Sequence, residues 1–228
     1  MIGFYDYTVV LTYLGLLSSV FGMTRVIQND YKTAIICLAI SGFCDCFDGK
    51  VARTKRNRTK DEKNFGIQLD SLSDVVCFGA FPALICYLLG MRSFFGVMIL
   101  FAYVIAAVIR LAYFNVLEGK RQETEEGGGR IYHGLPVTSI SALLPVAFLL
   151  KFVLPEFYFV LFLHVLMLAV AILFVVDFKF KKPSMKMIVI LIVCVAAALV
   201  LIYLFIHIEV PSAGEDPLMT FLRRGASS

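Results

Sequence analysis

The chain has 228 residues, of which 60% are hydrophobic and only 17% are charged, and its mean hydropathy is +0.85. Such a composition excludes an ordinary water-soluble domain, and the long continuous apolar runs argue against the alternating segments of about ten residues in a transmembrane β-barrel. The formal net charge of +4 is explained by basic connections between apolar segments, so we expect no nucleic-acid partner.

Seven apolar segments follow one another along the chain, each close to the roughly 20 residues that an α-helix needs to cross a bilayer. We therefore predict an all-α fold, a polytopic transmembrane helix bundle of about seven spans. One transmembrane domain would cover residues 1–208, and residues 209–228 would form a polar C-terminal tail. The predicted spans are Thr8–Ile27, Thr33–Ala52, Leu69–Leu89, Phe94–Val116, Leu135–Phe152, Phe157–Val176 and Met185–His207.

Basic residues predict the orientation of these spans. Lys and Arg are concentrated in the connections after the second, fourth and sixth spans, and cytoplasmic connections carry such an excess. We expect these connections and the N-terminus to face the cytoplasm, in a multi-pass protein of the cell membrane. No Lys or Arg precedes the first span, so we expect it to remain as a helix rather than to be a cleaved signal peptide.

The second and third spans contain four carboxylates, which are costly inside a membrane unless they are paired, solvated or bound to a cation. Asp45 and Asp48 share one face of the second span with Gly49, Ala52 and Arg53. Gly66, Asp70 and Asp74 share one face of the third. Because the outer acids of the two antiparallel spans lie about 12 Å from the connection, all four can converge in one cluster open to the cytoplasm.

Oxygen-only ligands favour hard divalent cations, and two such ions would polarise a phosphoryl group. Gly49 and Gly66 would leave room for a phosphate near the backbone, and Arg53 offers a forked cation for it. Together these residues predict a metal-assisted phosphoryl-transfer site.

The run from Asp45 to Arg53, followed by the run from Gly66 to Asp74, resembles the signature of the CDP-alcohol phosphotransferases, D-x2-D-G-x2-A-R and G-x3-D-x3-D. All eight signature positions are occupied. Twelve residues separate Arg53 from Gly66, more than is usual in the family. We expect the extra residues to lengthen the helix ends or the loop without moving the acids.

The resemblance implies a bundle with a six-helix core, usually homodimeric, with a two-metal site near the cytoplasmic surface. Asp45, Asp48, Asp70 and Asp74 would ligate two Mg²⁺ or Mn²⁺ ions, and Asp74 would also be the general base. The CDP-lipid would be bordered by the remaining signature positions and by a weaker match near the N-terminus, namely Gly49, Ala52, Arg53, Gly66 and Thr12.

Three further runs are similar to those of bacterial and archaeal phosphatidylserine synthases: Asp70–Pro82, Arg110–Asn115 and Gly134–Pro136. The resemblance implies CDP-diacylglycerol and L-serine as substrates. Arg110 could bind the serine carboxylate through two parallel contacts, and Asn115 could accept from the ammonium group or orient the carboxylate.

Alternatives remain open from the residues alone. The acceptor could be another small alcohol, such as glycerol phosphate or an inositol phosphate, or the lipid could be an archaeal ether lipid. The acids could instead line a cation transporter. The far halves of the second and third spans carry no charge, which favours an enzyme reached from one side. A non-catalytic scaffold would leave the signature unexplained.

Overall fold

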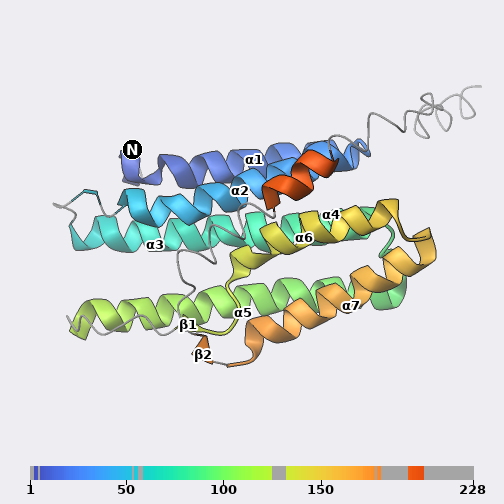
Figure 1. Cartoon of the computed structure of the whole chain (residues 1–228). Helices are drawn as coiled ribbons and strands as arrows, with labels where there is room; N and C mark the ends of the chain where they lie inside the picture. Colours follow the sequence, from blue (N-terminus) through green and yellow to red (C-terminus); the bar gives the residue numbers. More distant parts are fainter. Residues whose placement is uncertain are drawn as a thin grey trace, which may run out of the picture.

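The structure is a computed structural model that describes residues 3–4, 6–52, 54–55, 59–124, 132–177, 179–180 and 195–202. Long helices run side by side along one common direction, as Figure 1 shows. The all-α prediction is confirmed, and a pair of two-residue strands is the only addition to it within the described ranges.

The helical elements follow the predicted spans in order. They are α1 (Val10–Ile27), α2 (Tyr31–Ala52), α3 (Lys60–Asp74), a π-helical turn (Val75–Ala80), α4 (Phe81–Leu88), α5 (Phe94–Thr124), α6 (Ile140–Leu149) and α7 (Glu156–Val175). Short 3-10 turns precede α1 and α6 and follow α6, at Tyr7–Val9, Val137–Ser139 and Leu150–Phe152. Of the predicted seventh span only a helix at 195–202 belongs to the described residues, and the predicted tail lies outside them.

Four helical stretches in the described ranges are long and apolar enough to cross a membrane: Tyr7–Ile27, Lys60–Leu88, Phe94–Leu117 and Glu156–Val175. Val137–Phe152 is a shorter apolar stretch. The 22-residue helix α2 has the necessary length but carries several charged side chains. The chain is thus an integral membrane protein with several apolar helices.

The distribution of large apolar side chains fits a lipid surrounding. Side chains such as Leu17, Phe94 and Val165 are more than half exposed, whereas Tyr103 and Phe81 are fully buried between helices. In water such exposed side chains would be unfavourable, but in a bilayer the outer surface is as apolar as the interior. A helix satisfies most of its main-chain polar groups internally, as a membrane requires.

Helix α3 begins inside the long spacer between the two signature halves. Thr59 caps it: the Thr59 side chain accepts from the Glu62 main-chain N–H, and the Glu62 carboxylate accepts from the Thr59 N–H. Six spacer residues, 60–65, are therefore helical. Half of the twelve spacer residues thus belong to α3, which agrees with the expectation of a longer helix end or loop.

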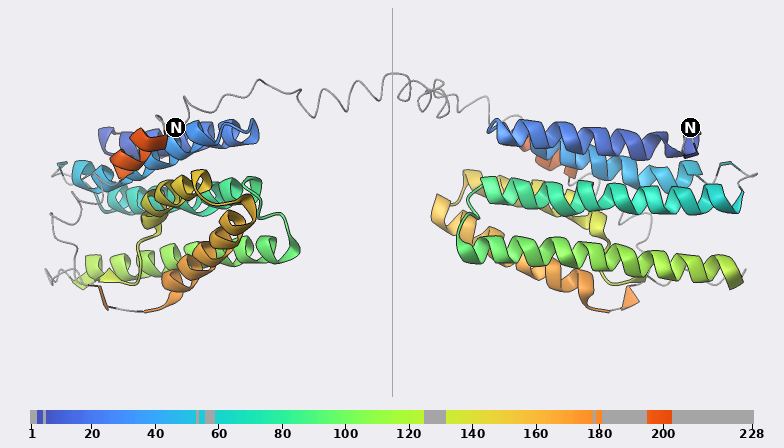
Figure 2. Two further views of the ribbon diagram at one scale, coloured as in Figure 1. Left: turned by 45° about the vertical axis from the view of Figure 1, so that its right-hand side comes forward. Right: turned by 180° about the vertical axis from the view of Figure 1, so that it is seen from behind.

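Helices α3 and α4 form one continuous stretch, joined by the π-helical turn that begins directly after Asp74. The main-chain N–H of Phe81 reaches the carbonyl of Val76, five residues back. Pro82 has no N–H for the carbonyl of Phe78, four residues before it, and the Tyr103 hydroxyl of α5 donates to that carbonyl instead. Figure 2 shows this stretch lying along α5.

Two short strands form a small antiparallel pair. The first, β1 (Tyr132–His133), lies between α5 and α6 in the chain, and the second, β2 (Lys179–Phe180), follows α7. This pair lies toward the end of the bundle that also holds the N-terminus and the α2–α3 connection, as Figure 1 shows. The described parts of the three connections predicted to be basic thus lie toward one end of the molecule.

Candidate metal-binding and active site

Helices α2 and α3 bring three of the four predicted acids together. Asp45, Asp70 and Asp74 each offer a carboxylate oxygen, and these oxygens all lie within 4.8 Å of one another. The equal depth that the spacing predicts for Asp45 and Asp74 is reproduced, since their carboxyls lie side by side. These three residues are called the acidic cluster below.

Asp48 lies at the edge of the acidic cluster, one turn closer to the end of α2. Its side chain is buried and lies beside the carboxyl of Asp70, but it is not within the 4.8 Å group. It also accepts a hydrogen bond from the Thr12 hydroxyl of α1, at 3.4 Å. Thr12 and Asp48 line one narrow cavity with Asp45 and Asp74, so α1 closes one side of the site.

No basic side chain pairs with these acids among the described residues. The ion pairs found there join Arg25 to Asp30, and Lys55 to Asp6 and Glu62. The Oδ1 atom of Asp70 is buried and has no hydrogen-bond partner within the described ranges. Carboxylates of like charge this close together are unfavourable without a neutralising cation.

These observations test whether divalent cations fit the site. The donor set consists of carboxylate oxygens, which hard cations such as Mg²⁺ and Mn²⁺ prefer. The unpartnered oxygen of Asp70 would gain a cation to coordinate, and the mutual repulsion of the carboxylates would be relieved. The residues therefore fit a divalent metal.

Gly49 differs from the glycines that pack helices together. A side-chain carbon added at Gly49 would meet no atom of the described residues within 4 Å. At Gly22 and Gly42 it would lie within 3 Å of a neighbouring helix, against Cys37 and Ser141 respectively. Packing therefore does not require glycine at position 49, and the open space beside it can admit a ligand.

The other predicted contacts of the CDP-lipid lie at the same end of α2 and α3. Ala52 is half-buried at the last position of α2, and Gly66 is half-buried one turn before Asp70. Arg53 lies outside the described residues.

The two residues predicted to bind serine point to different neighbours. Arg110 donates to the main-chain carbonyls of Gly134 and Leu135, each at 3.3 Å. Asn115 accepts a hydrogen bond from the Ser71 hydroxyl of α3, at 2.8 Å. Five residues along a helix correspond to a rotation of about 140°, so the two side chains do not share a face.

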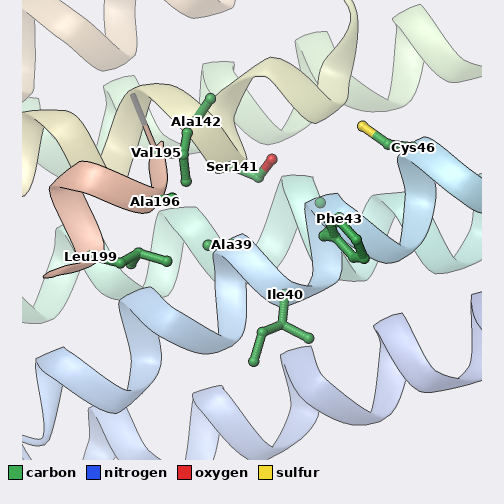
Figure 3. Close-up of a pocket in the computed structure, with 10 residues that line it drawn as sticks. Ala39, Ile40, Phe43, Cys46, Ser141, Ala142, Val195, Ala196 and Leu199 are labelled. Atoms are coloured by element: carbon green, nitrogen blue, oxygen red, sulfur yellow. The ribbon is translucent and has the colours of Figure 1, made fainter. Parts of the chain in front are cut away.

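An apolar pocket of about 350 Å³ lies on another side of α2. Figure 3 shows it between Ala39, Ile40 and Phe43 of α2, α6, and the helix at 195–202. Cys46, which follows Asp45 directly, is one of its lining residues. The pocket therefore reaches along α2 to the level of the acids.

Sequence reasoning missed two groups. Ser71 was overlooked because nothing in a single helix predicts a partner on α5. A second group links the N-terminal segment to the α2–α3 connection: Lys55 bridges Asp6 at 2.8 Å and Glu62 at 3.0 Å. We call these the Lys55 ion pairs. The pattern Thr59-x-x-Glu62 signals a helix start and could have located part of this group.

The charges of the Lys55 ion pairs stabilise one another. Hydrogen bonds from Lys55 and Thr8 hold the pKa of Asp6 at about 2, below its ordinary 3.8. Hydrogen bonds to Asp6 and Glu62 raise the pKa of Lys55. Both partners stay charged at neutral pH.

Comparison with known proteins adds independent information. The model of one protein family, CDP-alcohol phosphatidyltransferase, matches residues 8–208. A Saccharomyces cerevisiae protein named CDP-diacylglycerol–serine O-phosphatidyltransferase is 38% identical over 113 residues, which cover 48% of this chain and 40% of the relative.

Two further relatives come from an archaeon and a bacterium. An archaetidylserine synthase of Methanothermobacter thermautotrophicus is 32% identical over 129 residues, covering 56% of this chain and 51% of the relative. A CDP-diacylglycerol–serine O-phosphatidyltransferase of Helicobacter pylori is 32% identical over 139 residues, covering 58% and 54%. The matches thus span about half the length of these curated relatives, or somewhat less.

Proposed function

Because the chain belongs to the CDP-alcohol phosphatidyltransferase family, we propose that it is a phosphatidylserine synthase. It would transfer the phosphatidyl group of CDP-diacylglycerol to L-serine and release CMP. The observation that carries the proposal is the convergence of Asp45, Asp70 and Asp74 within 4.8 Å at the family's signature positions. The names of the relatives support serine as the acceptor.

The four acids would hold two divalent cations, Mg²⁺ or Mn²⁺. Asp45, Asp70 and Asp74 would supply most of the metal ligands, and Asp48 would add a ligand at the edge of the acidic cluster. Bound there, the ions would neutralise the diphosphate and stabilise charge on the attacking and leaving oxygens. The unpartnered Oδ1 of Asp70 supports this assignment.

The transfer itself needs a base for the serine hydroxyl. Asp74 would take the hydroxyl proton on its carboxylate, while the serine oxygen bonds to the phosphorus of the phosphatidyl group. The bond between that phosphorus and the CMP oxygen breaks, and CMP leaves with the electron pair. Fixed positions of the reacting groups supply much of the rate.

The lipid nucleotide would lie over the cytoplasmic ends of α2 and α3. The open space at Gly49 supports a close approach of the diphosphate, bordered by Ala52, Arg53 and Gly66. Thr12 would contact it from α1. The apolar pocket along α2 could take part of an acyl chain, because an apolar chain gains from apolar walls.

Serine would enter from the cytoplasm, toward which the basic connections would face. Arg110 remains our proposed contact for the serine carboxylate. Its guanidinium group, which donates to the carbonyls of Gly134 and Leu135, would also donate to that carboxylate. As the family resemblance implies, we also propose a homodimer in the cell membrane.

The test uses the detergent-purified full chain with CDP-diacylglycerol and Mn²⁺ or Mg²⁺, and follows CMP release with and without L-serine. Release that depends on serine is the expected result. Release with glycerol phosphate or an inositol phosphate but not with serine would overturn the acceptor. If no alcohol caused CMP release, the enzyme assignment would be overturned, and the alternative that the acids line a cation transporter would be favoured.

A second lipid substrate is suggested by one relative, which is named an archaetidylserine synthase. The same assay therefore compares CDP-diacylglycerol with CDP-archaeol, whose chains are ether-linked. A higher kcat/KM for CDP-archaeol would assign the chain to ether lipids while leaving the serine acceptor unchanged.

A further inference from the structure

Helix α5 makes two hydrogen bonds to the continuous stretch formed by α3, the π-helical turn and α4, one on each side of Asp74. Ser71, three residues before Asp74, donates its hydroxyl hydrogen to Asn115 Oδ1 at 2.8 Å. Phe78, four residues after Asp74, accepts from the Tyr103 hydroxyl through its carbonyl. The two contacts bracket Asp74, and the first of them lies directly beside Asp70.

The contact between Tyr103 and Phe78 is buried, and the contact between Ser71 and Asn115 is partly buried, with Asn115 half-buried. Ser71 is 8% exposed and Tyr103 is fully buried. A hydrogen bond between buried groups holds a fixed geometry, because breaking it would leave a polar atom without a partner. Helix α5 therefore resists both sliding and rotation of α3.

Such a restraint is needed because the acidic cluster is repulsive by itself. Asp70 and Asp74 on α3 face Asp45 on α2, with no basic partner among the described residues. Without a restraint, rotation of α3 would separate the carboxylates and widen the site. Ser71 directly follows Asp70, so its bond to α5 opposes this rotation at the cluster itself.

We propose that Asn115 is a positioning residue, which acts through its hydrogen bond to Ser71 to hold Asp70 and Asp74 at metal-binding separation from Asp45. This role differs from the direct serine contact expected from the sequence, and it is supported by the hydrogen bond that the Oδ1 atom of Asn115 accepts from Ser71. The inference rests on the proposed function in that the acidic cluster binds a divalent cation.

The experiment measures Mn²⁺ binding to the detergent-purified full chain, from the electron paramagnetic resonance signal of free Mn²⁺. Partners that orient metal ligands typically change metal affinity by 10-fold or more when they are removed. We expect Asn115→Ala and Ser71→Ala each to raise the Mn²⁺ Kd about 10-fold. The double variant should be no worse than either single variant, since both remove the same bond.

Two variants serve as controls. Ser18→Ala removes another hydroxyl that bonds between helices, from Ser18 of α1 to the Cys37 carbonyl of α2, away from the acids. It should leave Mn²⁺ affinity unchanged. Asn115→Asp keeps an acceptor oxygen for Ser71 and should not weaken Mn²⁺ binding. If Asn115→Ala fails to fold, Ser71→Ala and Asn115→Asp decide the question.

The kinetic readout separates positioning from acceptor binding. A positioning role shifts the Mn²⁺ concentration for half-maximal CMP release and leaves the serine KM close to wild type. Unchanged Mn²⁺ affinity with a raised serine KM would overturn the inference and restore the direct contact. Additive losses in the double variant would overturn it too. If wild type bound no Mn²⁺, the proposed function would fail, which is a distinct result.

Discussion

Two groups of carboxylates involve helix α3, and they differ in what neutralises them. Near the start of α3, Glu62 and the N-terminal Asp6 share the ammonium group of Lys55. Deeper in the helix, Asp70 and Asp74 meet Asp45 without a basic partner in the described part of the chain. The first group carries its own cation, whereas the second requires one from solution.

The comparison separates a structural role from a functional one. The Lys55 ion pairs tie the N-terminal segment to the α2–α3 connection, reinforced by the hydrogen bond between Tyr7 and Thr54 at 3.0 Å. Their removal should affect stability modestly, since ion pairs that solvent can still reach contribute little. The acidic cluster should show the opposite behaviour, with large effects on activity and a stability that depends on metal.

The largest expected effect is at Asp74. Replacing Asp74 with Asn removes the proposed base and one charge of the metal site, so CMP release should fall by at least about 100-fold. Binding of the CDP-lipid should be substantially retained, which a direct binding assay checks. The matched control is Glu62→Gln, a carboxylate of the Lys55 ion pairs, which should keep nearly full turnover. Full activity of Asp74→Asn would refute its role.

The next effect concerns stability with and without metal. In metal-free buffer, Asp70→Asn should raise the melting temperature, because one repelling charge is lost. With Mn²⁺ added, wild type should have the higher melting temperature, since a ligand at 100 times its Kd stabilises the folded protein by about 2.7 kcal/mol. Glu62→Gln should instead lower the melting temperature in both buffers. A melting temperature of Asp70→Asn below wild type without metal would contradict the repulsion argument.

A smaller effect is expected at the start of α3. Thr59→Ala removes the side chain that accepts from the Glu62 N–H and should cost about 1 kcal/mol of stability. Thermal unfolding followed by circular dichroism measures this loss. Thr59→Ser, which keeps the hydroxyl, should remain close to wild type; an equal loss in both variants would exclude capping as the cause.

The smallest effect is expected at Asp6. Asp6→Asn removes the charge paired with Lys55 and should lower the melting temperature slightly at neutral pH. Because the pKa of Asp6 in the folded protein is lowered to about 2 from 3.8, its stabilising contribution is complete above 3.8. The difference from wild type should therefore shrink as the pH falls from 3.8 toward 2, and also in high salt. A difference independent of both would point to another cause.

Much of this protein could be predicted from the sequence alone. The apolar runs predicted an all-α membrane bundle, and the i, i+4 spacing of Asp70 and Asp74 placed both on one helix face. Equal distances from the α2–α3 connection predicted that Asp45 would meet them. These features depend on the rise and rotation of one helix, or on one short connection, so local geometry determines them.

Only the tertiary structure decided which neighbour each helix face meets. It placed Asp48 beside Thr12 at the edge of the cluster, and it paired Asn115 with Ser71 of α3. It also brought the Tyr103 hydroxyl to the Phe78 carbonyl, which Pro82 cannot pair with because proline has no N–H. These contacts join residues 25 to 44 positions apart. They depend on how whole helices pack against one another, and the periodicity of a single helix carries no information about that packing.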